Sequence, residues 1–141
     1  MGIFKNPFGK KNKKPEQKGQ LVLSMPMFQG DSSYSADKVI QDLQSYWGLK
    51  VDEIEHSDTT ISFNIDGEVI VIGLIPAPIP DEEFESMYSY SYLWEDAEQE
   101  IKEHTQHAIV SVLGSSTSAL KRYSILSKVN ASILRTSETA I

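Results

Sequence analysis

The chain has 141 residues, no cysteine and a formal net charge of −7. A chain of this length forms one domain that can bury its own core. The lack of cysteine excludes disulfides, thiolate metal sites and thiol nucleophiles, and it favours a reducing, cytoplasmic location. No apolar run approaches the roughly 20 residues that a membrane-spanning helix needs, and no N-terminal apolar segment is typical of a signal peptide.

The first part of the chain is basic. Six lysines in its first eighteen residues oppose only Glu16, a net charge of +5, which leaves −12 for the remainder. We predict a disordered basic tail over residues 1–19 and a single domain over residues 20–141. The alternative for the tail is a weak membrane-surface contact, because three apolar residues precede its lysine cluster. The acidic domain argues against a nucleic-acid partner, since phosphate binding needs clustered Lys and Arg.

The domain is predicted to begin with a strand and a helix. Leu21–Phe28 reads LVLSMPMF, a strand in which Pro26 marks a bulge, a strand end or an edge. Apolar residues then recur at helical spacing over Ala36–Trp47. Ser35 is suited to the N-cap and Gly48 to the stop. The lone tryptophan at the end of this stripe is predicted to pack in the core.

A β-hairpin is the clearest element of the chain. Asp66-Gly67 stands between two β-prone runs and predicts a type I′ turn, because both residues tolerate positive φ. Apolar and polar residues alternate before the turn, which predicts a half-buried strand. Val69–Ile75 is apolar almost throughout, which predicts a strand covered on both faces. The eleven residues before the hairpin, Lys50–Thr60, are predicted to be a loop or a weak strand.

Prolines at every second position follow the hairpin. Pro76, Pro78 and Pro80 lack a backbone N–H, so we expect the sheet to stop there. The interpretation that we favour is a rigid exit, with Ile75, Ala77 and Ile79 packed inward. The alternative is a polyproline II ligand for an aromatic groove on a partner.

An acidic and aromatic segment comes next. Asp81–Glu85 reads DEEFE and is interpreted as a solvated loop, with a hard-cation site as the alternative. Tyr88, Tyr90 and Tyr92 alternate in MYSYSY, which is compatible with a short strand, an aromatic recognition surface or the start of a helix. A second helical stripe is predicted from Leu93 onward. Its members are Leu93, Trp94, Ala97, Ile101 and His104.

A strand and a long helix complete the chain. His107–Leu113 is apolar enough to be covered on both faces, and in a four-stranded sheet it would be an edge without protecting charge or proline. We expect either the last helix or a further strand to cover it. That helix is predicted over Thr117–Arg135, with an apolar stripe. The stripe consists of Leu120, Tyr123, Leu126, Val129, Ile133 and Leu134.

The order β-α-β-β-α-β-α predicts an α+β fold. Two helical crossovers around a hairpin give a split β-α-β sandwich, with an antiparallel or mixed sheet and helices packed on one face. An unprotected edge would also allow two copies of the chain to pair as a homodimer.

Three stretches resemble those of a known family. They are IPAPIP over Ile75–Pro80, Leu93-Trp94 with Ala97, and HAIVSVLG over His107–Gly114. With them, the chain from about Leu21 to Arg135 resembles the bacterial family catalogued as domain of unknown function 4261. The resemblance implies a cytoplasmic α+β protein with no established reaction. Because family members run on after the last helix, it also implies that this chain covers the N-terminal part of the family domain.

Catalytic constellations are scarce in the sequence. His104 and His107 are three residues apart beside Glu100 and Glu103, but a closed metal site needs about four ligands, and a strand-end role for His107 is the simpler interpretation. The chain lacks the phosphate-binding glycine loops and the nucleophile elbow of hydrolases. We therefore assign no catalytic residue, no cofactor and no metal.

The favoured function is a non-enzymatic protein-interaction module, of an immunity-like or scaffold kind, with another protein as its partner. The support is the acidic surface and the tyrosine triplet, since tyrosine anchors interfaces well. The alternative is a hydrolase-type or metal-dependent enzyme with its site near the proline exit and His107. The predicted interaction surface consists of Pro76, Pro78, Pro80, Tyr88, Tyr90, Tyr92, Trp94 and His107.

Overall fold

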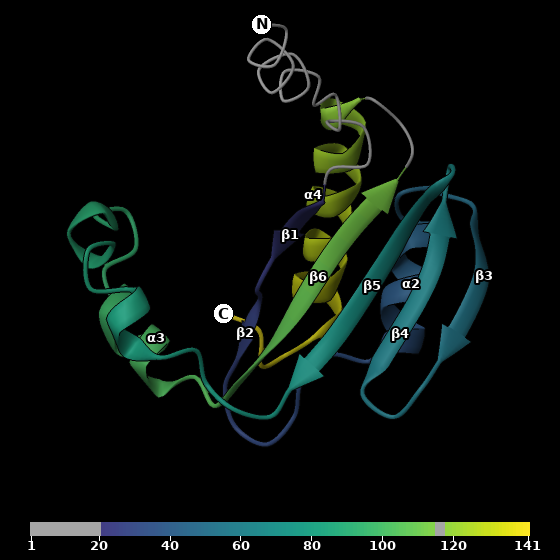
Figure 1. Ribbon diagram of the computed structural model, residues 1–141. Helices are drawn as coiled ribbons and strands as arrows, with labels where there is room; N and C mark the ends of the chain where they lie inside the picture. The colour runs from purple at the N-terminus through teal and green to yellow at the C-terminus, as the bar shows by residue number, and fades with distance from the viewer. Residues whose placement is uncertain (1–20, 115–117) are drawn as a thin grey trace, which may run out of the picture.

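The computed structural model describes residues 21–114 and 118–141, which form an α+β fold with helices packed on an antiparallel sheet (Figure 1). The predicted fold class is thereby confirmed. The strands are β1 (Val22–Ser24), β2 (Met27–Phe28), β3 (Val51–His56), β4 (Thr60–Ile65), β5 (Glu68–Ile75) and β6 (Gln106–Gly114). The helices are α2 (Ala36–Ser45), α3 (Ala97–Glu103) and α4 (Ala119–Thr136), and two 3-10 turns span Asp81–Glu83 and Tyr88–Tyr90. The predicted basic tail with its membrane contact lies outside the described residues, as does Thr117.

The sheet is a meander extended on one side. β3 pairs with β4, β4 with β5 and β5 with β6, all of them antiparallel. β1 and β2 pair antiparallel with the other side of β6, so the order is β1-β6-β5-β4-β3. α2 crosses from β1 and β2 to β3 at the opposite edge, as a crossover does. The second connection differs from the expected crossover, because α3 lies between the neighbouring antiparallel strands β5 and β6.

β6 is an inner strand, because β1 and β2 pair beside it; of the two covers expected for His107–Leu113, a further strand is the one present. Pro26 separates β1 from β2 along its outer side, as predicted for a strand end, and the Pro26 carbonyl accepts from Ala108 N–H at 2.9 Å. The end of the chain then returns to β2, where Ile141 N–H donates to the Met27 carbonyl at 3.1 Å. Pairing of two copies through β6 is therefore not available.

The predicted hairpin between β4 and β5 is confirmed. Asp66 and Gly67 have φ of 55° and 84°, both positive, as a type I′ turn requires. Ile65 and Glu68 form the pair that closes the turn. β5 ends at Ile75, directly before the first of the three prolines, as predicted.

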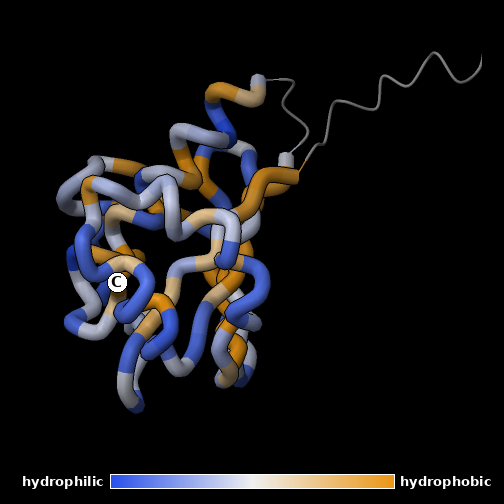
Figure 2. Tube along the Cα trace, turned by 90° about the vertical axis from the view of Figure 1, so that its left-hand side faces the viewer, coloured by the Kyte–Doolittle hydropathy of each residue, from blue (hydrophilic) through white to orange (hydrophobic). Residues whose placement is uncertain are grey.

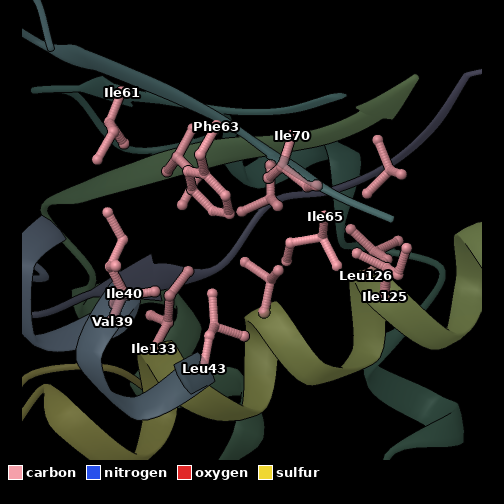
Figure 3. Close-up of a cluster of buried hydrophobic side chains, with 14 of the residues drawn as sticks. Val39, Ile40, Leu43, Ile61, Phe63, Ile65, Ile70, Ile125, Leu126 and Ile133 are labelled. Atoms are coloured by element: carbon pink, nitrogen blue, oxygen red, sulfur yellow. The ribbon is translucent and has the colours of Figure 1, made fainter. Parts of the chain in front are cut away.

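One face of the sheet is buried under α2 and α4 (Figure 3). Alternate residues of the strands point to this face, because side chains of a strand alternate between the two sides of a sheet. The labelled core side chains are Val39, Ile40, Leu43, Ile61, Phe63, Ile65, Ile70, Ile125, Leu126 and Ile133. At about 1.5–3 kcal/mol for each fully buried side chain, this face is the main source of stability.

α2 begins at Ala36 as predicted, whereas α4, predicted from Thr117, is described from Ala119 with Ser118 as its N-cap. Both helices bury narrower stripes than expected. Ser35 caps α2 by accepting from Lys38 N–H at 3.4 Å, and α2 ends at Ser45, shortly before Gly48 at φ 66°. The apolar stripe predicted for the last helix is only half right. Three of its members are exposed, because only one side of α4 touches the sheet. They are Leu120, Tyr123 and Leu134.

No helix within the described residues covers the other side of the sheet, so the prediction that β5 and β6 are covered on both faces is wrong. Val69 and Leu113 pair across the two strands and are exposed there, and Leu23 of β1 is exposed on the same side. We call this side the open face. A meander covered by helices on one side leaves such a face to water or to a partner.

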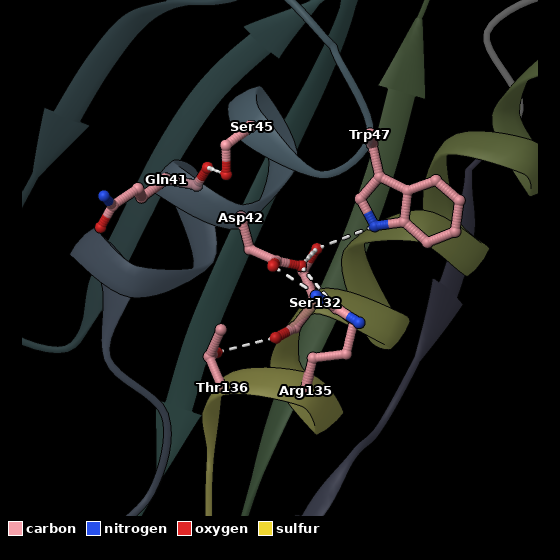
Figure 4. A network of polar contacts seen from close by, with 7 residues as sticks. All are labelled: Gln41, Asp42, Ser45, Trp47, Ser132, Arg135 and Thr136. Atoms are coloured by element: carbon pink, nitrogen blue, oxygen red, sulfur yellow. Dashed lines mark hydrogen bonds and ion pairs between the residues drawn. The ribbon is translucent and has the colours of Figure 1, made fainter.

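A polar network joins α2 to α4 (Figure 4). Asp42 accepts hydrogen bonds from Ser132 Oγ at 2.7 Å and from Arg135 Nε at 3.1 Å, and Trp47 Nε1 donates to Ser132 Oγ at 3.1 Å. Burial acts to raise the pKa of Asp42, but the hydrogen bonds from Ser132 and Arg135 and the charge of Arg135 outweigh it and lower the pKa below 3.8. Trp47 packs against the core, as predicted.

Candidate functional site

The connection between β5 and β6 is the most unusual part of the fold. Residues 76–105, which we call the arm, hold the prolines, both 3-10 turns and α3. The arm stands apart from the sheet on the left of Figure 1. The predicted helical stripe from Leu93 is wrong in its first turn, because α3 begins only at Ala97 and Leu93 is exposed. Thirty residues between two adjacent strands are far more than an ordinary hairpin loop needs.

Two histidines form hydrogen bonds with the backbone of the proline segment, residues 76–80. Ile79 N–H donates to His104 Nε2 at 2.9 Å, and His107 Nδ1 donates to the Ala77 carbonyl at 2.8 Å. Ile79 and both histidines are buried, whereas Ala77 and all three prolines are exposed. The predicted rigid exit is therefore right for Ile79, but the inward packing expected of Ala77 is wrong.

The histidine contacts also define the tautomers of both rings. His104 Nε2 accepts a proton donor, so the ring proton is on Nδ1, where it contacts the Ile101 carbonyl. His107 donates from Nδ1 to a carbonyl, which leaves Nε2 as the acceptor in the neutral ring. Both nitrogens of His104 are thus engaged, and the two histidines do not form the metal pair weighed from their spacing. Among the described residues, no three His, Asp or Glu side chains gather as metal ligands.

The tyrosine segment forms a 3-10 turn, so the strand interpretation is wrong. Tyr88 donates its hydroxyl to Asp81 Oδ1 at 2.6 Å. That hydrogen bond, with some burial and the nearby Asp81, Glu98 and Glu85 charges, raises the Tyr88 pKa to about 12. The Tyr88 hydroxyl is therefore used in a hydrogen bond within the arm.

The next residues face water. Tyr90, Tyr92 and Leu93 are 80%, 81% and 88% exposed. Trp94 is partly exposed, and its Nε1 donates to Glu100 Oε2 at 2.9 Å. The arm thus exposes a run of large side chains, Tyr90, Tyr92, Leu93 and Trp94, which we call the tip of the arm. Hydrogen bonds within the arm, from Tyr88 to Asp81 and from Trp94 to Glu100, stabilise its conformation.

A hollow of about 570 Å³ lies where the prolines leave the sheet. Its apolar walls come from separate elements, and within the described part of the chain Glu83 and His107 are its only polar lining residues. The lining consists of Met25, Ile79, Pro80, Glu83, Phe84, Met87 and His107. Of the predicted surface, the hollow brings Pro80 and His107 together, whereas Pro76, Pro78, Tyr90, Tyr92 and Trp94 lie outside it. Sequence reasoning missed Met25, Phe84 and Met87, and nothing local to Met25 signals a contact with residues about 60 positions away.

The arm carries the negative charge of the chain. It holds nine acids against one lysine, a net charge of −8, so the rest of the chain sums to +1 of the total −7. Lys102 pairs with Glu98 at 2.8 Å, and the hydrogen bond and charge of Glu98 raise the Lys102 pKa. Figure 2 looks at the molecule from the side of the arm and shows many blue, hydrophilic stretches toward the viewer.

Comparison of the chain with protein-family models, with curated proteins and with solved structures finds no match. The resemblance to domain of unknown function 4261 therefore stays a prediction. Within the described residues, none of the helices has the length and apolar character needed to span a membrane.

Proposed function

We propose that this protein is a non-catalytic interaction module that binds a protein partner through the tip of the arm. The observation that carries the proposal is the run of exposed large side chains from Tyr90 to Trp94, namely Tyr90, Tyr92, Leu93 and Trp94. Contiguous exposed apolar side chains rimmed by charge are typical of interaction sites. Tyrosine and tryptophan also provide much contact area at a low cost in side-chain entropy.

The internal hydrogen bonds of the arm support this role. The bond from Tyr88 to Asp81 joins the two 3-10 turns, and the bond from Trp94 to Glu100 joins the segment before α3 to that helix, both before any partner arrives. A surface that is already ordered loses less entropy on binding. The net charge of −8 favours a basic partner, because complementary charge speeds encounter and rejects acidic competitors.

The enzyme alternative has one observation in its favour. The hollow joins Pro80, Glu83 and His107, the arrangement expected of an enzyme site at the proline exit. The other described residues of its lining are apolar and offer no hydroxyl nucleophile or second acid beside the histidine. Binding therefore fits this lining better than catalysis. A cytoplasmic setting belongs to the same proposal.

Affinity capture from the native cell, with quantitative mass spectrometry, tests the proposal. The arm variant replaces three exposed side chains by serine, in Tyr90→Ser, Tyr92→Ser and Leu93→Ser. These side chains have no hydrogen bond to the rest of the arm among the described contacts, so the fold should be kept. We expect the partner captured by the wild type to be lost with the arm variant.

A matched control replaces three exposed apolar residues of α4, in Leu120→Ser, Tyr123→Ser and Leu134→Ser. This variant removes a similar apolar area from a different surface. The control should retain the partner. If both variants capture the same proteins as the wild type, the arm tip is not the binding surface and the proposal fails.

A further inference from the structure

We propose that the hollow at the base of the arm is an anchor pocket for a basic peptide segment, into which an aromatic or aliphatic side chain flanked by Lys or Arg inserts. The inference rests on the proposed function and names the chemistry of the partner. It assigns a binding role to the residues that line the hollow, none of which belongs to the exposed tip.

The walls of the hollow suit an apolar side chain. Met25 comes from the junction of β1 and β2, and Met87 lies between the two 3-10 turns, so the walls belong to two separate segments. Both methionines are exposed, with Met87 at 54%. Flexible thioether side chains adapt to differently shaped apolar groups, which is why methionine is common at peptide-binding surfaces. The volume of about 570 Å³ lies within the roughly 300–1,000 Å³ typical of ligand pockets.

The floor of the hollow is held in place. Ile79 is fixed by its hydrogen bond to His104, and His107 by its hydrogen bond to Ala77. Phe84 packs edge-on against the His104 ring, with ring centroids 6.2 Å apart. A floor that is ordered before binding adds little entropy cost to the insertion of a side chain.

The charge around the hollow selects a basic peptide. Glu83 lines it, and Asp81, Glu82 and Glu85 of the same acidic run are exposed beside it. No Lys or Arg is among the lining residues that the structure describes. An acidic rim attracts lysine and arginine and repels anionic lipid headgroups and nucleic acid. A basic peptide with an apolar anchor is therefore the occupant that matches both the walls and the rim.

The hollow also opens toward the open face of the sheet. His107 pairs with Ile75 in the register of β5 and β6, and it lies on the same side of the sheet as Ile109 and Leu113. A bound peptide that leaves the hollow in this direction would meet more apolar surface, which favours a peptide over a small molecule.

Isothermal titration of the full chain with three synthetic peptides tests the inference. The first peptide has a Leu-Phe pair between four lysines, the second replaces the pair by alanines, and the third replaces the lysines by glutamines. We expect measurable binding of the first peptide only. Raising the ionic strength from about 0.05 M to about 0.5 M should weaken this binding, because the rim contacts are exposed.

Variants of the protein test whether the peptide binds in the hollow. Met87→Gln keeps the length of the side chain but makes it polar, and it should weaken binding about tenfold through the loss of apolar contact. Glu83→Gln should weaken binding several-fold and reduce its dependence on salt. Leu120→Gln, an exposed apolar residue on α4, is the matched control and should bind as the wild type does.

Two results would overturn the inference. The first is binding of the glutamine peptide as tight as that of the lysine peptide, which would make the hollow a general apolar site. The second is binding of the lysine peptide that Met87→Gln leaves unchanged, or no binding at all. If the cellular partner still depends on the arm tip in either case, the proposed function stands and only the anchor pocket is refuted.

Discussion

Replacing His104 by phenylalanine tests whether one buried ring holds the arm. Phenylalanine keeps the ring and its edge-on contact with Phe84. It removes the acceptor of the Ile79 N–H, which lies at 2.9 Å from His104 Nε2 in a buried position. The prolines on either side of Ile79 leave the backbone little freedom to find another acceptor. The buried N–H is therefore expected to lose its partner.

The cost of an unpaired buried N–H is about 1–3 kcal/mol. The arm stands apart from the sheet and makes few contacts with it. We therefore expect the substitution to lower the free energy of local opening of the arm and to leave the free energy of unfolding of the sheet unchanged. At about 1.4 kcal/mol per decade, this cost corresponds to an opening equilibrium that is about 5- to 150-fold more favourable. The midpoint of thermal unfolding should move by no more than about 2 °C, since the core under α2 and α4 is unchanged.

Native-state hydrogen exchange, followed residue by residue by NMR, measures this directly. The Ile79 amide should exchange about 5- to 150-fold faster in the variant. The Ile70 amide of the central strand β5 should keep its protection. His56→Phe is the control, because His56 is exposed on β3 and touches no part of the arm. An unchanged Ile79 amide, or an equal loss of protection at Ile79 and Ile70, would refute the idea that His104 acts as a local clamp.

Three further predictions concern buried or hydrogen-bonded charges. Because the folded pKa of Asp42 lies below 3.8, its carboxylate stabilises the fold above that pH and the contribution is lost as pH falls through the folded pKa. Asp42→Asn should therefore be less stable than the wild type in urea at neutral pH and equal to it once the wild-type carboxyl is protonated; a deficit that persists in acid would contradict this. Gly114→Ala places a methyl group on the buried Glu68 carboxylate and should cost about 1–3 kcal/mol by denaturant unfolding. In a Glu68→Ala background the same change should be nearly neutral, and an undiminished cost would disprove the clash. Asp81→Asn should lower the Tyr88 pKa from about 12 toward 10.0, and an absorbance titration in which no tyrosine shifts would count against the hydrogen bond.

The features predicted correctly from sequence are those decided within a few residues. The Asp66-Gly67 turn needs two residues that accept positive φ, and no distant contact changes that requirement. Ser35 caps α2 through its own third neighbour, Lys38. Pro76 ends β5 because its missing N–H cannot take part in a ladder. In each case the cause and the effect lie in the same short stretch of chain.

The wrong predictions share a different cause. An apolar stripe shows which side chains could be buried, but it does not show whether a surface is free to bury them. The helix-facing side of the sheet is filled by α2 and α4, so Leu93 in the middle of the arm remains in water. The strand that covers β6 could not be identified from the sequence for a similar reason. Its neighbour β1 lies more than 80 residues earlier, and nothing in the strand itself identifies that partner.

At the candidate site, too, some features follow from the local sequence and others from contacts between distant segments. Residue type and local order are enough to predict that the sheet stops at Pro76, that a charged and aromatic segment follows, and that the next strand begins close to His107, where the structure has its first residue at Gln106. The meeting of Met25 with Met87 and His107 around a hollow depends on contacts between distant segments, because antiparallel pairing of β1 and β2 with β6 brings Met25 to the base of the arm. Which faces and edges stay exposed is settled by packing between distant segments, and the surfaces proposed for binding are those that this packing leaves uncovered.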